Sequence, residues 1–473
     1  MRWSGFRSII KLSASLVVPV ILARLLSPNE FGLIAMGAVF TNISVLIADL
    51  GTGDALIQKQ KADQILESSV FWLNIGIAGS LAGTLVFFSP YIGSFYGEPV
   101  VADVVLSLSL VLLIQSFNLV QVALLKKHRH FKTIAIAELG SQVGGAILAI
   151  SLAVRGFGIW SLIYYSIAKA VFYTLIIWFF SRWRPSFYFD AVKIRTIFNF
   201  SLNLTAVKFL NYVERNSDKL IIGYWQGTSS LGVYTRAYES FHQIIKFVNG
   251  LYAPVFYSVV SNKQNDLDGL KKIVLLSYQS YLYIFIPISA VLFMLSSKLV
   301  FLVFGDQWLE MAPILSVLGG VCLVKPIHKL NVEIFKSVDK VDTLRRVWLF
   351  FTPIFVGGFF IGNYYFGLIG VATAYLVISC IITIVTTYLV ASYLNLTARN
   401  MKEAFLILFF RGVSMCFCMT AFLSPLISGW SNGNFLVDLA MQLFSISIIY
   451  LSLQAVFPVK AQREIFKILR PKS

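Results

Sequence analysis

Apolar runs of about 20 residues recur along the whole chain, and each is long enough to cross a lipid bilayer as a helix. Only 13% of the 473 residues are charged and 58% are hydrophobic. A soluble protein of this length would carry about twice that charged fraction. Because the bilayer interior offers no water to backbone polar groups, this pattern predicts an all-α polytopic membrane protein.

The runs predict about 14 transmembrane helices. Their expected bounds are 6–26, 31–53, 70–92, 102–123, 133–153, 159–180, 198–222, 231–253, 273–296, 311–332, 347–363, 368–391, 404–427 and 435–457. The segments between them are short, which leaves no room for a soluble catalytic domain on either side.

Lysine and arginine are distributed very unevenly among these connecting segments. If the N-terminus is cytoplasmic, nearly all of the bases outside the spans fall on the inside, and the outside loops hold only Arg155 and Lys298. The positive-inside rule accounts for such a bias with both termini cytoplasmic. The net charge of +17 therefore reflects membrane topology, and no nucleic-acid partner is expected.

The predicted spans themselves also contain more bases than acids. Charge inside a bilayer is unfavourable, so these residues are expected to face a wet interior, which here would favour an anion. The bases are Lys11, Arg24, Lys169, Lys208, Arg215, Lys219, Arg236, Lys246, Lys325, Lys329 and Arg411, and the acids include Asp49, Glu138, Glu214, Asp218, Glu239 and, near the end of a span, Glu333. The four cysteines lie in apolar spans and indicate neither disulfides nor a metal site.

Three short motifs recur in the same order about 200 residues apart, which indicates an internal repeat of six spans. They are Phe31-Gly32 with Leu231-Gly232, Tyr96-Gly97 with Phe304-Gly305, and Phe157-Gly158 with Phe366-Gly367. An even-numbered repeat predicts two lobes related by an axis along the membrane normal, around a central cavity. The expected organisation is an N-terminal lobe (1–180), an interfacial linker (181–197), a C-terminal lobe (198–391), two further helices (392–457) and a basic cytoplasmic tail (458–473).

Several motif stretches are spread over nearly the whole chain, namely Leu22–Gly32, Ala48–Gln58, Val70–Asn74, Phe95–Pro99, Gly156–Trp160, Arg215–Gly223 and Phe304–Trp308. They resemble the polysaccharide transporter family, and most closely its colanic-acid-exporter branch. This family belongs to the multidrug/oligosaccharidyl-lipid/polysaccharide exporter superfamily. The sequence departs from the family pattern near Lys336–Asp339, in the turn after the tenth span.

The resemblance implies two six-helix lobes in a V around a central cavity, with two further helices. It also implies a flippase that moves an undecaprenyl-diphosphate-linked oligosaccharide across a bacterial inner membrane for O-antigen, exopolysaccharide or capsule synthesis. Transport would proceed by alternating access, with H⁺ or Na⁺ as the coupling ion and no bound cofactor. Membrane lipids, a polysaccharide polymerase and glycosyltransferases of the same pathway are the other expected partners.

The seventh predicted span, 198–222, carries the densest charge. On an ideal helix Lys208, Arg215 and Lys219 fall on one side, while Glu214 and Asp218 occupy the adjacent sector. We call these three bases the cationic stripe. Because Arg and Lys bind compact polyanions, the stripe is predicted to receive the diphosphate of the substrate. The alternative is internal pairing with the neighbouring acids, together with snorkelling of the bases at the outer end of the span.

The eighth span adds Arg236 and Lys246 as further cationic cavity residues. Coupling or gating roles are predicted for Arg24 near the outer end of the first span and for the acids Asp49, Glu138, Glu214, Asp218 and Glu239. Simpler alternatives are a salt bridge of Glu138 at the cytoplasmic edge, snorkelling of Arg236 to the interface, and a local ion network of Glu239.

Two other functions compete with flipping. An ion-coupled multidrug antiporter would favour an acidic or apolar pocket for cationic drugs, and the basic excess argues against it. A polysaccharide polymerase or ligase would need a large outside loop. The sequence lacks a phosphate-binding loop motif, and Asp266-Leu-Asp268 lies in a loop too short to belong to a nucleotide-sugar domain. The chain is therefore expected not to be an enzyme.

Overall fold

The computed structural model describes residues 17–59, 63–261, 267–338, 340–397, 399–400, 402, 405, 414 and 435–456. All regular secondary structure in these ranges is helical. The predicted tail at 458–473 and most of the predicted span at 404–427 lie outside the described residues, as does the first half of the span at 6–26.

Long helices separated by short turns make up the described chain. Within it, seven helices have the length and composition to cross a membrane, or eight if α5 and α6, bent by 42°, form one broken span. A further helix covers 17–25. The named elements are α2 (Pro28–Asp49), α3 (Thr52–Gln58), α4 (Gln64–Tyr96), α5 (Val100–Ser116), α6 (Leu119–Lys127), α7 (Phe131–Val154), α8 (Ile159–Phe180), α9 (Ala191–Ser261), α10 (Leu267–Phe304), η1 (Asp306–Trp308), α11 (Met311–Ser337), α12 (Val341–Tyr393) and α15 (Phe435–Val456).

Two of these elements each contain a break. Gly227 interrupts α9 with φ of 80°, and Gly367 interrupts α12 with φ of 57°. Glycine, which lacks a Cβ, adopts this left-handed region without strain. The breaks separate the spans predicted at 198–222 and 231–253, and those predicted at 347–363 and 368–391. The all-α membrane fold expected from the apolar runs is therefore confirmed.

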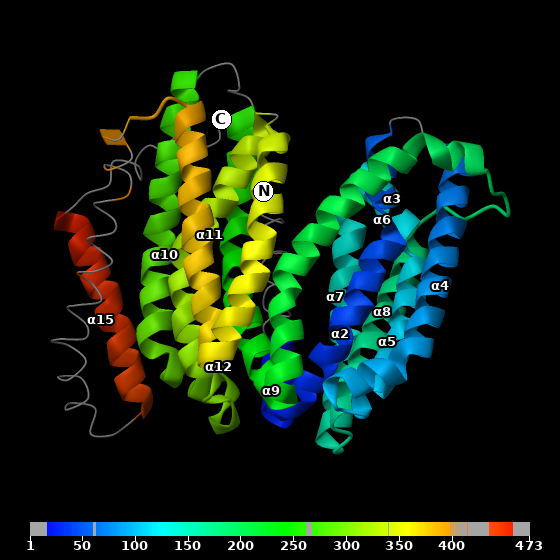
Figure 1. The fold of residues 1–473 in the computed structure, drawn as a ribbon, viewed down its shortest axis with the longest axis horizontal. Helices are drawn as coiled ribbons and strands as arrows, with labels where there is room; N and C mark the ends of the chain where they lie inside the picture. Colours follow the sequence, from blue (N-terminus) through cyan, green and yellow to red (C-terminus); the bar gives the residue numbers. More distant parts are fainter. Residues whose placement is uncertain are drawn as a thin grey trace. The chain divides into compact units, whose positions relative to one another are not determined.

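Contacts divide the chain into two units, Met1–Thr235 and Arg236–Ser473. In the first unit α7 packs on α8, α4 on α5, and α2 on both α4 and α5 (Figure 1). In the second unit α11 packs on both α10 and α12, and α15 lies along α10 (Figure 1). Helix α9 contributes residues to both units, because the boundary follows Thr235.

Large apolar side chains cover the outer surface of the helices. Phe87, Phe179, Phe366 and Tyr388 are each mostly exposed. Such a surface would be unfavourable in water and is expected where lipid tails surround a protein. The fold is therefore that of a multi-pass membrane protein.

The predicted interfacial linker is held tightly against the start of α4. The side chain of Ser68 accepts a hydrogen bond from the Ser186 amide (3.0 Å), and Ser69 accepts one from the Asp190 amide (2.8 Å). The Trp72 indole donates to the Ser186 carbonyl at 2.9 Å. These contacts fix the point from which α9 begins.

An exposed ion pair adds to the attachment of α9. Lys193 in its first turn binds Asp63, which also caps α4 by accepting from the Leu66 amide at 3.0 Å. The Lys193 hydrogen bond and this amide hold the pKa of the Asp63 carboxyl below its usual range. The carboxylate therefore keeps its charge at neutral pH.

The sequence Ser27-Pro-Asn-Glu30 caps the start of α2. The Glu30 carboxylate accepts hydrogen bonds from the Ser27 amide (2.6 Å) and the Ser27 hydroxyl (2.9 Å), while Pro28 occupies the first turn. This is a capping arrangement, which satisfies helix donors that have no partner within the helix. A Cβ on Gly158 would lie 2.6 Å from a Glu30 oxygen, so two of the motif stretches meet here.

The repeat-related glycines Gly32 and Gly232 lie in one close helix crossing within the first unit. A Cβ on Gly32 would overlap the carbonyl of Thr228, and a Cβ on Gly232 would overlap the carbonyl of Pro28. Each glycine thus faces the residue four positions before the other. Small residues permit this close backbone approach in membranes. The reciprocal contact is what a twofold relation between repeats would produce.

Candidate functional site

The junction of α2 and α3 forms one side of the candidate site. Leu50 and Gly51 both adopt left-handed conformations, with φ of 45° and 66°, so the helix breaks directly after Asp49. The Thr52 hydroxyl donates to the Asp49 carbonyl at 2.7 Å, and the Asn74 amide of α4 donates to the Thr52 hydroxyl at 3.1 Å. The motif at 48–58 therefore presents its carboxylates from a fixed helix break.

Lys208 of α9 binds at this break. Its ammonium lies 2.7 Å from a carboxylate oxygen of Asp54 and 3.0 Å from one of Asp49. The sequence predicted that Lys208 binds substrate in a cationic cavity and that Asp49 has a coupling or gating role. The structure brings these two residues together and adds Asp54, which the sequence analysis did not single out. Lys208 is therefore paired with acids of the α2–α3 break, and not with the acids beside it on α9 that the alternative interpretation named.

The two acids of the seventh predicted span face the protein interior. Glu214 and Asp218 are each only 2% exposed. The Tyr234 hydroxyl, on the part of α9 beyond the Gly227 break, donates to Asp218 at 2.8 Å. The Lys219 amide donates to the other Asp218 oxygen, also at 2.8 Å. This polar contact joins the two helical parts of α9.

The remaining stripe bases are more accessible than those acids. Arg215 is exposed and Lys219 is half-buried. The same turn of α9 is held against α2 by the Tyr212 hydroxyl, which donates to the Val39 carbonyl at 2.5 Å. On this part of α9 the two acids are therefore buried, while Arg215 and Lys219 on the adjacent side are more accessible.

The other predicted residues lie apart from this group along the chain. Arg236 binds Glu239 one turn away in α9, at 3.3 Å, as the spacing suggested. Lys246, farther along α9, and Arg24, in the helix before α2, are both exposed, and Glu138 is half-buried in α7. Among the described residues, no group of three or more His, Cys, Asp or Glu side chains is arranged to hold a metal ion.

The second unit contains a buried polar network that sequence reasoning did not connect. The Tyr278 hydroxyl donates to Asn331 at 2.5 Å, and the Asn331 amide donates to Thr386 and Thr387 at 3.1 and 2.9 Å. His328 shares Thr386 at 3.2 Å. These polar residues join α10, α11 and α12. In the sequence, the spacing of polar residues within apolar spans was the feature that could have indicated this network.

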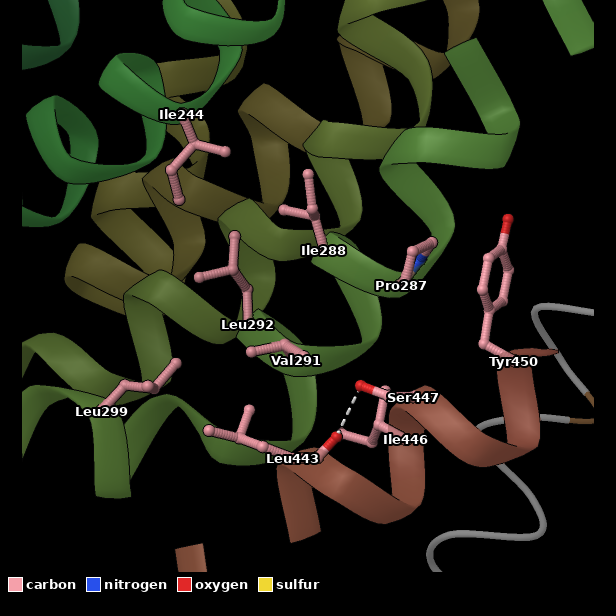
Figure 2. Close-up of a pocket in the computed structure, with 10 residues that line it drawn as sticks. All are labelled: Ile244, Pro287, Ile288, Val291, Leu292, Leu299, Leu443, Ile446, Ser447 and Tyr450. Atoms are coloured by element: carbon pink, nitrogen blue, oxygen red, sulfur yellow. Dashed lines mark hydrogen bonds between the residues drawn. The ribbon is translucent and has the colours of Figure 1, made fainter. Parts of the chain in front are cut away.

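An apolar pocket of about 610 Å³ also lies in the second unit. Figure 2 shows its lining from α10 and α15, with Ile244 of α9, and with Ser447 and Tyr450 as the polar residues. Lys298 of α10 binds Asp438 of α15 and donates to Gln442 at 2.9 Å. Lys298, predicted to lie in an outside loop, is instead a helix residue that holds α15 in place.

Comparison with known proteins decides the family. The profile of a family described as polysaccharide biosynthesis protein matches residues 21–313. The chain belongs to this family. The resemblance drawn from the motif stretches is thereby confirmed.

Two curated relatives of this polysaccharide biosynthesis protein come from bacteria. The succinoglycan biosynthesis transport protein ExoT of Rhizobium meliloti (strain 1021) is 28% identical over 67% of this chain, and the aligned part spans 64% of ExoT. The lipopolysaccharide biosynthesis protein WzxC of Escherichia coli (strain K12) is 24% identical over 82% of this chain and 79% of WzxC.

Among solved structures, the lipid II flippase MurJ in an inward closed conformation superposes with a TM-score of 0.74 at 16% identity. The match covers 98% of each chain. At this identity the likeness shows the fold alone. Family and fold together make this protein a multi-pass membrane protein of the polysaccharide biosynthesis family.

Proposed function

We propose that this transporter flips a lipid-linked oligosaccharide, joined to its polyprenyl carrier by a diphosphate, from the cytoplasmic to the outer face of the bacterial inner membrane. The observation that carries the proposal is the position of the cationic stripe. Its bases lie at the accessible side of α9 and at the α2–α3 break, while Glu214 and Asp218 are buried. A diphosphate is the kind of compact polyanion that such bases bind.

The proposal includes the finer architecture expected from the sequence. Fourteen spans would form two six-helix lobes around a central cavity, with two further helices and both termini in the cytoplasm. The reciprocal Gly32–Gly232 crossing supports the repeat on which this architecture rests. Alternating access between the lobes would then expose the stripe to one side of the membrane at a time.

We also propose that an H⁺ or Na⁺ gradient drives the cycle. Glu214 and Asp218 are the best supported coupling residues, because buried acids in membrane transporters commonly bind the coupling ion. Asp49, Glu138 and Glu239 remain further candidates for coupling or gating, and Arg24 for gating. Glycosyltransferases of the pathway would supply the substrate, and the polymerase would consume it after transport.

The decisive test measures lipid-linked repeat units on each side of the membrane after deletion of the gene. We expect them to accumulate on the cytoplasmic side. Complementation with Arg215→Ala should reduce export about tenfold or more at matched protein levels, since a hydrogen bond to a charged group contributes about 1.5–3 kcal/mol. Lys132→Ala, an exposed base in the first turn of α7, is the control and should export normally.

Two results would count against the proposal. Wild-type export by both Arg215→Ala and Lys208→Ala would show that the cationic stripe does not handle the substrate. A deletion strain that accumulates no repeat units but changes its drug resistance would instead favour the multidrug antiporter.

A further inference from the structure

Lys208 is surrounded by more negative than positive charge. Asp54 and Asp49 both contact its ammonium, at 2.7 and 3.0 Å, so the three groups together carry one net negative charge when ionised. All three side chains are partly accessible: Lys208 is 33% exposed, Asp49 22% and Asp54 47%. In this arrangement a diphosphate that approaches Lys208 meets repulsion as well as attraction.

The two carboxylates are not held equally. Asp49 ends α2, accepts a weak hydrogen bond from the Gly53 amide at 3.4 Å and has its own carbonyl bound by Thr52. Asp54 is the more exposed of the two and lies in the first turn of the short helix α3. Exposed ion pairs exchange partners at low cost, so Asp54 is the partner that Lys208 can leave more easily.

The two further bases described near this break, Lys59 and Lys127, have other partners. Lys59, at the end of α3, donates to Thr196 at 2.8 Å. Lys127 of α6 donates to the Lys59 carbonyl at 2.7 Å. From α4, the residue that reaches the break is the neutral Asn74. The charge balance at Lys208 is thus set mainly by Asp49 and Asp54.

We propose that Asp54 is a competing counter-ion that masks Lys208, and that the substrate diphosphate displaces Asp54 from the Lys208 ammonium. Asp49 keeps the ammonium at the helix break while Asp54 releases it. When the diphosphate leaves, Asp54 recaptures Lys208, which prevents the site from retaining its cargo. This inference rests on the proposed function, because it assumes that a diphosphate reaches the stripe.

The test is a double-mutant cycle on the full chain in nanodiscs of neutral lipid, with farnesyl diphosphate as the probe and farnesol as the uncharged control. We expect Asp54→Asn to tighten binding about 1.5-fold to fivefold, as removal of an exposed counter-ion allows. Asp103→Asn removes a similar exposed acid from the first turn of α5 and should leave the affinity unchanged.

Masking acts through Lys208, so the gain should depend on that residue. In a Lys208→Met background we expect Asp54→Asn to produce little or no tightening, whereas Lys208→Arg should preserve most of the gain. Equal gains with and without Lys208 would overturn the inference, because they would show simple long-range repulsion. Weaker binding by Asp54→Asn would also overturn it, since Asp54 would then position Lys208 for the ligand.

The outcomes separate this inference from the proposed function. Wild-type protein that binds farnesyl diphosphate no better than farnesol would contradict the diphosphate substrate itself, and the masking role with it. Tight wild-type binding without the Lys208-dependent gain would overturn the masking role alone. Thermal unfolding midpoints close to that of the wild type would exclude loss of folding as the cause of any change in affinity.

Discussion

At the scale of single residues, Tyr234 holds the carboxylate of Asp218 on the buried side of α9. Both side chains are almost fully buried, and the hydroxyl donates across the turn that Gly227 creates. A buried carboxylate that loses a hydrogen-bond donor is left with an unmet interaction, which lowers the stability of the folded state.

Replacing Tyr234 by Phe should therefore lower the free energy of unfolding by about 1–3 kcal/mol. The thermal midpoint of the purified protein in detergent is the measurement. Tyr224→Phe, which changes an exposed tyrosine on the same helix, should leave the midpoint nearly unchanged. Equal midpoints for both variants would mean that the Tyr234 hydroxyl contributes nothing to stability.

Sequence reasoning identified some of these residues and missed others for a clear reason. Charge in an apolar span made Lys208, Asp49 and Asp218 conspicuous. Asp54 and Tyr234 carried no such signal, because Asp54 lies just beyond the predicted span 31–53 and tyrosine is a common residue of apolar spans. Their roles depend on which helices are neighbours in space.

At the scale of helices, the crossing of α2 and α9 depends on two glycines. The backbone of one helix occupies the space that a side chain at Gly32 or Gly232 would need. The sequence paired these residues as repeat markers, but it could not show that they touch each other.

Gly32→Ala should force the helices apart and lower the free energy of unfolding by about 1–3 kcal/mol. Gly83→Ala in α4 is a matched control, because a Cβ there meets nothing within 4 Å. In that open helical position alanine should stabilise the protein by about 0.4–1 kcal/mol. Thermal midpoints in detergent measure both changes, and a Gly32→Ala protein as stable as Gly83→Ala would contradict the close crossing.

The attachment of the linker after α8 is also a property of how the helices are arranged. Its basic and aromatic composition predicted an interfacial segment, but composition could not identify its attachment. Ser68, Ser69 and Trp72 of α4 fix its backbone, so the start of α9 is anchored to α4. The physical reason is that side-chain to backbone hydrogen bonds between distant segments leave no periodic trace in the sequence.

At the scale of the whole molecule, the distribution of Lys and Arg predicts the membrane orientation. Arg155 between α7 and α8 should be outside, and Lys126 at the end of α6 should be inside. The bias arises during insertion, when positively charged loops are retained in the cytoplasm.

Cysteine labelling tests this orientation in cells. In a variant whose four native cysteines are replaced, a membrane-impermeant maleimide should label Arg155→Cys in intact spheroplasts. Lys126→Cys should react only after the membrane is permeabilised. Labelling in the opposite order would reverse the predicted topology, and with it the direction of transport that we propose.

The sequence by itself determined that this protein spans a membrane as helices, that it belongs to a polysaccharide biosynthesis family, and which helix carries the densest charge. These properties follow from local composition, periodicity and motif order. Only the tertiary structure decided that Lys208 is shared by Asp49 and Asp54 and that the acids of α9 turn inward. Those facts depend on which side chains meet across helices, and a one-dimensional pattern does not specify such contacts.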